Sequence, residues 1–113
     1  PKDFLLAGQY VEDLGVAAYK GQVGNLLAAG VSAQPILAGA LEIHTVEARH
    51  AAGIRYLRNE LLGAKIRPWI RSSSEVIYQE ERDDSPIPFD SVSFDGYATR
   101  DEVLALVGPI LNP

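Results

Sequence analysis

Residues 33–62 read AQPILAGALEIHTVEARHAAGIRYLRNELL, and the spacing of their apolar side chains decides the fold. Apolar positions recur three and four residues apart, which is the period of one helix face, and no strand-like alternation interrupts them. A helix of this length spans roughly 45 Å at 1.5 Å per residue, the length of a bundle helix. The shared face contains Ile36, Ala40, Ile43, Glu47, His50, Ala51, Ile54, Leu57 and Leu61. The side chains that point away are Glu42, Arg49, Tyr56 and Glu60.

Local signals mark both ends of this helix. Ser32 stands where an N-cap residue is expected, and Pro35 falls in the first turn, where proline is tolerated because its missing N–H has no intrahelical partner. Gly63 follows Leu62 and is expected to end the helix.

An earlier helix is predicted from about Asp3 to Ala29, before a break at Gly30–Ser32. Two long helices joined by a short break should form an antiparallel hairpin. The earlier helix contains several glycines, and each costs about 0.5 to 1 kcal/mol relative to alanine. We therefore expect close helix contacts or a kink at these positions, which are Gly8, Gly15, Gly21 and Gly24.

The chain divides into a helical hairpin, residues 1–67, and a loop-rich C-terminal tail, residues 68–113. The charged run at 80–84 is expected to be a solvated loop, since it lacks the Asp-x-Asp-x-Asp-Gly spacing of a calcium loop. Thr99 and Glu102 have the spacing of a capping box and predict a short closing helix near 100–108 that ends near Gly108–Pro109.

Composition limits the possible functions. The chain has 113 residues, a formal net charge of -5 and no cysteine, so one domain or part of one is expected, without disulfides or thiolate metal sites. Clustered Lys and Arg that would grip nucleic-acid phosphates are missing, and no apolar stretch reaches the roughly 20 residues of a membrane span. The chain starts at Pro1 and contains no methionine, so we expect further helices or an export signal upstream.

Three residues form a candidate metal site. Glu47 and His50 lie one turn apart on the apolar face of the long helix, close enough to reach one ion or a pair of ions. Glu12 lies on the inward stripe of the earlier helix, where an antiparallel hairpin can bring it opposite Glu47. Bundles that hold two iron or two manganese ions use two single Glu residues and two Glu-x-x-His pairs, and this chain contains half of that set.

A second interpretation needs no metal. Glu12, Glu47 and His50 can instead form an internal hydrogen-bonded cluster with Arg58, which we expect on the same face. His44 is expected to pack or to hydrogen-bond to a ligand rather than to bind the ion itself. Tyr19 lies two turns from Glu12 and is expected to be a core residue rather than a redox partner.

Several ordered blocks of the sequence resemble a known family, the ferritin-like domain proteins that include the plant desiccation-related proteins and many bacterial members. These blocks are Glu12–Gly21, Ile36–Ala38, Val46–Ala51 with Ile54–Arg55, and Tyr97–Leu104. The resemblance implies an all-α, ferritin-like four-helix bundle, of which this chain forms half: the third and fourth helices as a long antiparallel hairpin, then an irregular tail.

The resemblance also implies a di-metal site of iron or manganese at Glu12, Glu47 and His50, although some desiccation-related members lack the Glu-x-x-His. It implies an exported protein, in the periplasm, the cell envelope or outside the cell. The other two helices should come from a missing N-terminal helix pair or from a second copy of the chain, as in the two-helix encapsulated ferritins.

Two functional hypotheses follow from these observations. The first is a metal-binding, ferritin-like protein with a role in stress or desiccation. The second is a non-catalytic structural or assembly subunit that uses the bundle as a scaffold without metal. Under both hypotheses the wide apolar face must be covered, so we expect a homo-oligomer unless the missing helices cover it.

Overall fold

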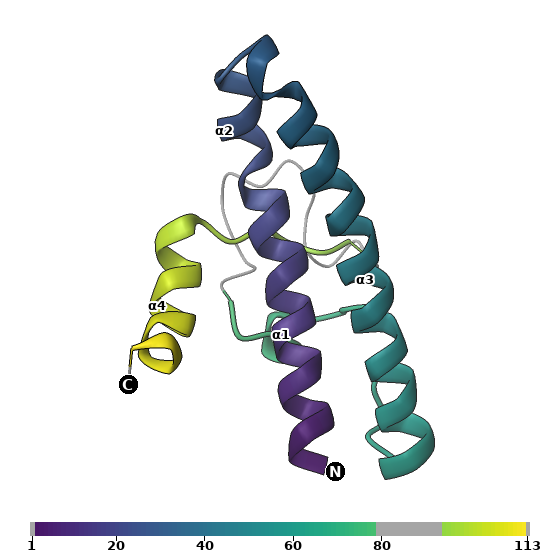
Figure 1. Ribbon diagram of the computed structural model, residues 1–113. Coiled ribbons are helices and arrows are strands. Elements are labelled where there is room, and N and C mark those ends of the chain that lie inside the picture. The colour runs from purple at the N-terminus through teal and green to yellow at the C-terminus, as the bar shows by residue number, and fades with distance from the viewer. Residues whose placement is uncertain (1, 79–93, 113) are drawn as a thin grey trace.

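The computed structural model describes residues 2–78 and 94–112, and in these residues the protein is all-α, with no strand. Helices α1 (Lys2–Gly21) and α3 (Gln34–Leu62) form the long arms of an antiparallel hairpin (Figure 1). Helix α2 (Val23–Ala28) and the 3-10 turn η1 (Val31–Ala33) build its tip. A second 3-10 turn, η2 (Ser73–Glu75), lies in the tail, and α4 (Arg100–Leu111) closes the chain. The all-α hairpin with a short closing helix is confirmed.

Three facing pairs define how α1 packs against α3. A Cβ atom on Gly8 would lie 3.3 Å from Cδ1 of Ile54, Glu12 contacts His50, and Gly15 faces the side chain of Glu47. For each advance of three or four residues along α1, the facing position on α3 moves back by the same number. This constant register is that of a straight antiparallel contact, and the glycines permit close approach, as expected.

The predicted single helix over Asp3–Ala29 is interrupted at Gln22, between α1 and α2. The tail crosses α1 at this point, and a Cβ atom on Gly21 would overlap the carbonyl oxygen of Ala98. Glycine therefore allows two backbone segments to meet where the helix breaks. The expected effect of the glycines is confirmed here, whereas Gly24 has nothing within 4 Å of its Cβ position.

The ends of α3 follow the sequence signals in part. Pro35 lies in the first turn as predicted, but the N-cap residue is Ala33 and no side chain caps the helix, so the prediction of Ser32 was wrong. The turn η1 tightens the backbone before the helix and replaces a side-chain cap with local 3-10 bonds. At the other end, Gly63 has φ 60° and donates its N–H to the carbonyl of Asn59 at 2.9 Å, which confirms the predicted stop.

The tail packs along one side of the hairpin, which leaves the opposite side of α1 and α3 uncovered by other described residues (Figure 1). The Ala98 N–H donates to the Ala17 carbonyl at 2.9 Å, and the Lys20 ammonium donates to the Asp95 carbonyl. Apolar side chains complete this contact in one cluster. Its buried members are Leu14, Ala17, Tyr78 and Ala98.

Helix α4 begins with the predicted capping box, because Thr99 and Glu102 exchange both hydrogen bonds. It continues through Pro109 to Leu111, slightly beyond the predicted end near Gly108–Pro109. Proline in the last turn removes one backbone donor, and the Asn112 N–H still donates to the Gly108 carbonyl at 2.9 Å. The acidic run at 80–84 lies outside the described residues.

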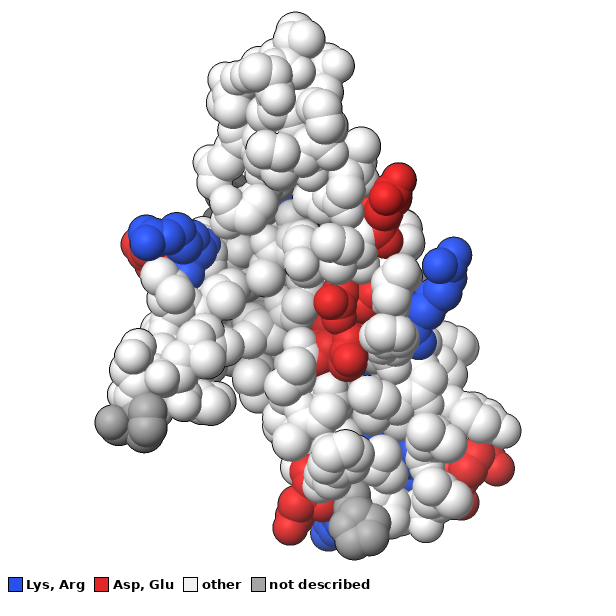
Figure 2. All heavy atoms as spheres, in the orientation of Figure 1, with Lys and Arg blue, Asp and Glu red and all other residues white. Residues whose placement is uncertain are grey.

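The uncovered side of the hairpin is apolar at several predicted inward positions. Of the shared face of α3, only Ala51 is buried, whereas Ile36, Ile43 and Leu57 are exposed. Among the described residues no element covers this face, which agrees with the expectation that a further helix pair or a second copy must do so. Figure 2 shows in addition that the hairpin tip carries no charged side chain, and residues 21–41 contain none. No helix of the described residues is long and apolar enough to cross a bilayer.

Candidate metal centre

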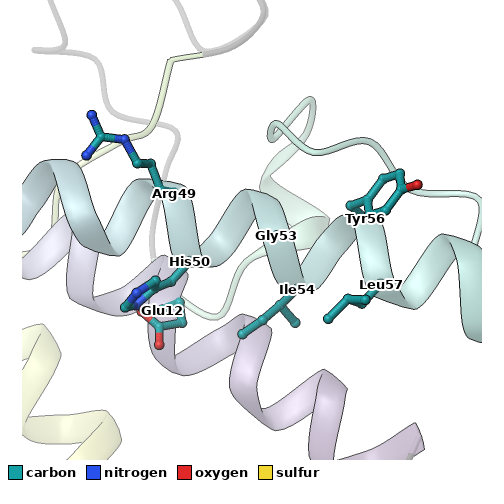
Figure 3. Close-up of a pocket in the computed structure, with 7 residues that line it drawn as sticks. All are labelled: Glu12, Arg49, His50, Gly53, Ile54, Tyr56 and Leu57. Atoms are coloured by element: carbon teal, nitrogen blue, oxygen red, sulfur yellow. Dashed lines mark hydrogen bonds and ion pairs between the residues drawn. The ribbon is translucent and has the colours of Figure 1, made fainter.

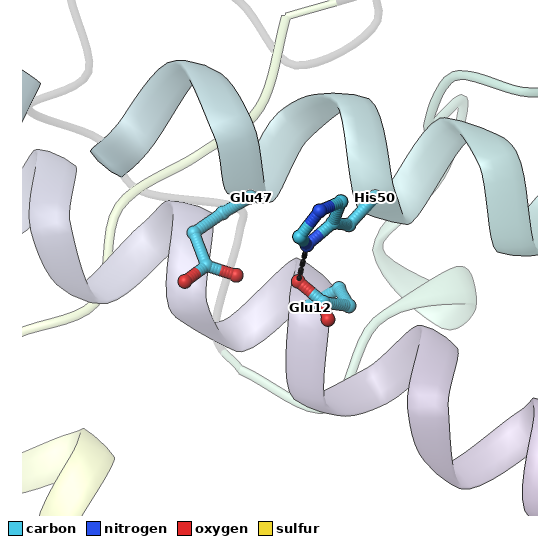
Figure 4. Close-up of side chains that lie close together, drawn as sticks. All are labelled: Glu12, Glu47 and His50. Carbon is cyan, nitrogen blue, oxygen red and sulfur yellow. Dashed lines mark hydrogen bonds and ion pairs between the residues drawn. The ribbon is translucent and has the colours of Figure 1, made fainter. Parts of the chain in front are cut away.

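Glu12, Glu47 and His50 meet on the uncovered side of the hairpin (Figure 4). One ligand atom from each residue lies within 4.8 Å of the others, so a single position can be reached by all three. Nδ1 of His50 lies 3.3 Å from Oε2 of Glu12. The structure thus brings together the three predicted site residues from two different helices.

The local fold explains this convergence. Glu47 and His50 are three residues apart on α3 and point to the same side, one turn from each other. Glu12 lies directly opposite them because of the helix register. Gly15 provides space for the Glu47 side chain, since a Cβ atom there would lie 3.1 Å from both Cδ and Oε2 of Glu47.

The three side chains remain partly or largely accessible to solvent within this chain. The Glu12 side chain is 22% exposed and that of His50 is 55% exposed. The reason is the uncovered face of α3, on which Ile43 and Leu57 are also exposed. An ion can therefore reach the site from solvent.

Proximity of two carboxylates dominates the electrostatics. The pKa of Glu47 is raised to about 7, first because its protonated form hydrogen-bonds to Glu12, then because of burial and the repulsion from the Glu12 charge. His50 has the opposite and smaller effect. A proton shared between Glu12 and Glu47 thus occupies a place where a cation would neutralise both.

A groove of about 530 Å³ opens beside Glu12 and His50 (Figure 3). Ile54 and Leu57 extend on the same side of α3 as His50, whereas Arg49 projects from the other side. The groove is therefore apolar next to the three ligand atoms. Such a surface fits an apolar side chain or helix rather than a charged molecule.

A second polar group lies on the side of the hairpin that the tail covers. The Arg55 guanidinium contacts both carboxylate oxygens of Asp13, with Nη2–Oδ2 at 2.5 Å and Nε–Oδ1 at 3.4 Å, and its Nη1 lies 3.1 Å from Oε2 of Glu75. The side chains of Asp13 and Arg55 are each 1% exposed. Burial raises the pKa of Asp13 to about 6, although the Arg55 charge lowers it.

The sequence interpretation missed this buried pair, although a signal was present. Gln9 and Asp13 lie four residues apart on α1, and Arg55 and Arg58 lie three apart on α3. These spacings define a second, polar stripe on each helix, and complementary stripes on antiparallel helices can pair. Arg58 indeed donates to Oε1 of Gln9.

The other residues singled out in the sequence, Arg58, His44 and Tyr19, make no described hydrogen bond to Glu12, Glu47 or His50. Arg58 bonds to Gln9, so the predicted cluster of Arg58 with the three site residues is not formed. Nε2 of His44 is buried without a hydrogen-bond partner among the described residues. Burial raises the pKa of Asp95, and the nearby His44 offsets part of this rise. Tyr19 is half-buried.

Comparison with known proteins adds the family. The sequence pattern of the Ferritin-like domain matches residues 1–60, which include α1, the hairpin tip and most of α3 with all three site residues. No curated protein and no solved structure matches the chain. The matched residues make up more than half of the sequence, and the chain therefore belongs to the Ferritin-like domain family.

Proposed function

We propose that this protein binds a transition-metal ion, iron or manganese, through Glu12, Glu47 and His50. The observation that carries the proposal is the convergence of two carboxylates and one imidazole within 4.8 Å. Carboxylate and imidazole are ligands that suit iron and manganese, and the chain has no thiolate to favour a softer site.

The protonation of the site supports the proposal. Glu12 and Glu47 lie close enough for one proton to be held between them, which raises the pKa of Glu47 to about 7. A divalent cation replaces that proton and removes the repulsion between the carboxylates. When bound, such an ion supplies Lewis acidity, and iron also supplies one-electron chemistry.

We further propose that the site is half of a two-metal centre. Two-metal bundles of this kind use two Glu residues and two Glu-x-x-His pairs, twice the set in this chain. The other half would come from a second helix pair, contributed by residues upstream or by a second copy in a homo-oligomer. Exposed apolar side chains on the shared face of α3 support a helical partner on this side: Ile36, Ile43, Leu57, which also lines the groove, and Leu61.

Within the family, we propose a relation to the desiccation-related members and a role in stress protection, which the matching sequence blocks of both helices and the closing segment support. The second candidate function is a structural or assembly subunit without metal. One observation favours it: His50 and Glu47 already have polar neighbours in Glu12, so the group can be satisfied internally.

Elemental analysis of the intact protein, followed by titration with Fe²⁺ and Mn²⁺, tests the proposal. We expect stoichiometric iron or manganese in the wild-type protein and its loss in the Glu47→Ala and His50→Ala variants. Matched controls on the same helix are Glu42→Ala and His44→Ala, which remove the same side-chain types outside the ligand group.

The outcomes separate the two functions. Metal retained by the controls and lost by the site variants supports metal binding. A metal-free protein that binds neither ion, and whose stability and assembly survive replacement of all three residues by apolar ones, supports the structural subunit instead.

A further inference from the structure

We infer that the buried Asp13–Arg55 pair, anchored by Glu75, is a positioning device that sets the register of α1 on α3 and so aligns the metal ligands. The part of this inference that concerns the ligands rests on the proposed metal binding, because their alignment matters only if they bind an ion. Its structural part, the control of register, stands on contacts of the described residues.

The pair links the two helices directly behind the metal site. Asp13 follows Glu12 on α1, so any movement of the Asp13 backbone also moves Glu12. Arg55 lies on α3 five residues after His50, on the side that the tail covers. The ion pair and the ligand group therefore join the same two stretches of helix on opposite sides of the hairpin.

The geometry of the pair resists both sliding and rotation. Two nitrogens of Arg55 contact the two oxygens of Asp13, at 2.5 Å and 3.4 Å, in the fork arrangement that arginine and carboxylate favour. A shift of one residue along a helix moves a side chain by about 1.5 Å, which exceeds the tolerance of these bonds. Because both side chains are 1% exposed, water does not compensate for a lost contact.

Neighbouring contacts extend the device. Nη1 of Arg55 contacts Oε2 of Glu75 at 3.1 Å, which connects the pair to the turn η2. Arg58 donates to Gln9, one turn away on each helix, and the Gln9 amide reaches the Glu75 carbonyl at 3.4 Å. Five side chains thus hold α1, α3 and the tail together in one polar row.

The ligand side of the hairpin lacks comparable constraints. On this side α1 presents Gly8, Glu12 and Gly15 to α3. The two glycines have no side chain to interlock with α3, and Glu12 makes a single hydrogen bond to the largely exposed His50. The polar row on the other side of the hairpin therefore supplies the buried, directional contacts that fix the register of the two helices.

The first part of the test measures Co²⁺ binding to the intact protein by titration and visible absorption, which reports ligand geometry. The variants are Asp13→Asn, which removes the charge at nearly constant volume, and Arg55→Lys, which keeps the charge but loses the fork. The matched control is Leu14→Ala, which weakens the apolar contact with the tail and leaves the pair in place. We expect both pair variants to lose about ten- to hundredfold in affinity with a changed spectrum, the scale seen when groups that orient ligands are altered.

The second part needs no metal. Cysteines introduced at exposed Val11 and Glu60 are the only thiols in the chain and carry spin labels that report the distance between α1 and α3. We expect one narrow distance in the wild type and in Leu14→Ala, and a shifted or broadened distribution in Asp13→Asn and Arg55→Lys.

Each outcome decides one claim. Unchanged distances in both pair variants overturn the inference, whatever the metal data show. A wild-type protein that binds no Co²⁺, Fe²⁺ or Mn²⁺ contradicts the proposed function, while altered distances in the variants still support control of register. If Asp13→Asn and Arg55→Lys lost no more Co²⁺ affinity than Leu14→Ala, the pair would contribute only to general stability and the inference on ligand alignment would be overturned.

Discussion

Gly15 and Glu47 face each other across the hairpin with no space for a methyl group between them. A Cβ atom on Gly15 would lie 3.1 Å from Cδ and Oε2 of Glu47, so the carboxylate would have to move by a few tenths of an ångström. The absence of a side chain on Gly15 therefore determines where the Glu47 carboxylate, a proposed metal ligand, lies.

We accordingly expect Gly15→Ala to weaken metal binding while leaving the helix intact. Alanine favours the helix by about 0.5 to 1 kcal/mol, which offsets part of the strain, whereas displacement of the Glu47 carboxylate lowers affinity roughly tenfold. Titration calorimetry with Mn²⁺ and thermal unfolding measure the two effects separately. The matched control is Gly39→Ala on α3, where nothing lies within 4 Å of the Cβ position. Equal metal affinity in both variants would contradict the assigned role of Gly15.

The raised pKa of Glu47 predicts how stability without metal depends on pH. Its pKa is about 7 in the folded protein, against 4.5 for an ordinary glutamate, so the folded state holds this proton more tightly than the unfolded state. The free energy of unfolding should then fall as pH rises from about 4.5 to about 7 and change little above that. Urea unfolding at a series of pH values measures this dependence, and the difference between wild type and Glu47→Gln isolates it from other groups. A pH dependence identical in both proteins would exclude the shared proton.

The same proton must leave when a cation binds. Metal affinity should therefore rise with pH up to about 7, and below that pH binding should release protons from the site. Calorimetric titrations in buffers of different ionisation enthalpy count the released protons. Glu42→Gln, exposed on the same helix, should leave the count unchanged.

The buried ion pair predicts strongly non-additive effects on stability. Asp13→Leu alone leaves the Arg55 charge buried without its main partner, which costs on the order of 3 to 5 kcal/mol. The double variant with Arg55→Met replaces both charges by apolar groups of similar volume and should recover much of this loss. Urea unfolding of the two single variants and the double variant measures the coupling between them. Simple addition of the single effects would mean that the two side chains act independently.

Much of the fold was predictable because it depends on local signals. The period of apolar residues on α3, the stop at Gly63 and the capping box at Thr99 each act within a few residues, and the structure confirms all three. The break at Gln22 was predictable only as a weak point, because its position depends on where the distant Ala98 meets Gly21.

The site was predictable to a similar extent. Glu12, Glu47 and His50 come together because helix periodicity and an antiparallel hairpin are sufficient to align them. The partner of Arg55 was not found, because its pairing with Asp13 depends on the relative rotation of two helices and on burial by the tail. The side chain of His50 is 55% exposed because it lies on the uncovered face, and a sequence pattern indicates that this face is apolar but not which element covers it.

The contact between Gly21 and Ala98 gives a last prediction, on the attachment of the tail. Gly21→Ala places a methyl group where the Ala98 carbonyl lies, and backbone on both sides cannot yield as a flexible side chain would. The tail must then move away from α1, which breaks the hydrogen bond from the Ala98 N–H to the Ala17 carbonyl and loosens the cluster around Leu14. We expect a loss of about 1 to 3 kcal/mol in the free energy of unfolding, the usual cost of an overpacked site.

Hydrogen exchange of the segment 94–99 measures this loosening directly, because protection of the Ala98 amide depends on the bond to Ala17. Gly24→Ala is the matched control: Gly24 lies three residues further along, in α2, and has nothing within 4 Å of its Cβ position. The control should gain about 0.5 to 1 kcal/mol from its better helix former and leave exchange in the tail unchanged. If Gly21→Ala also left this exchange unchanged, the close backbone contact would not be what holds the tail against α1. The proposed metal ligands lie on the other side of the hairpin, so neither variant should alter the affinity for Mn²⁺.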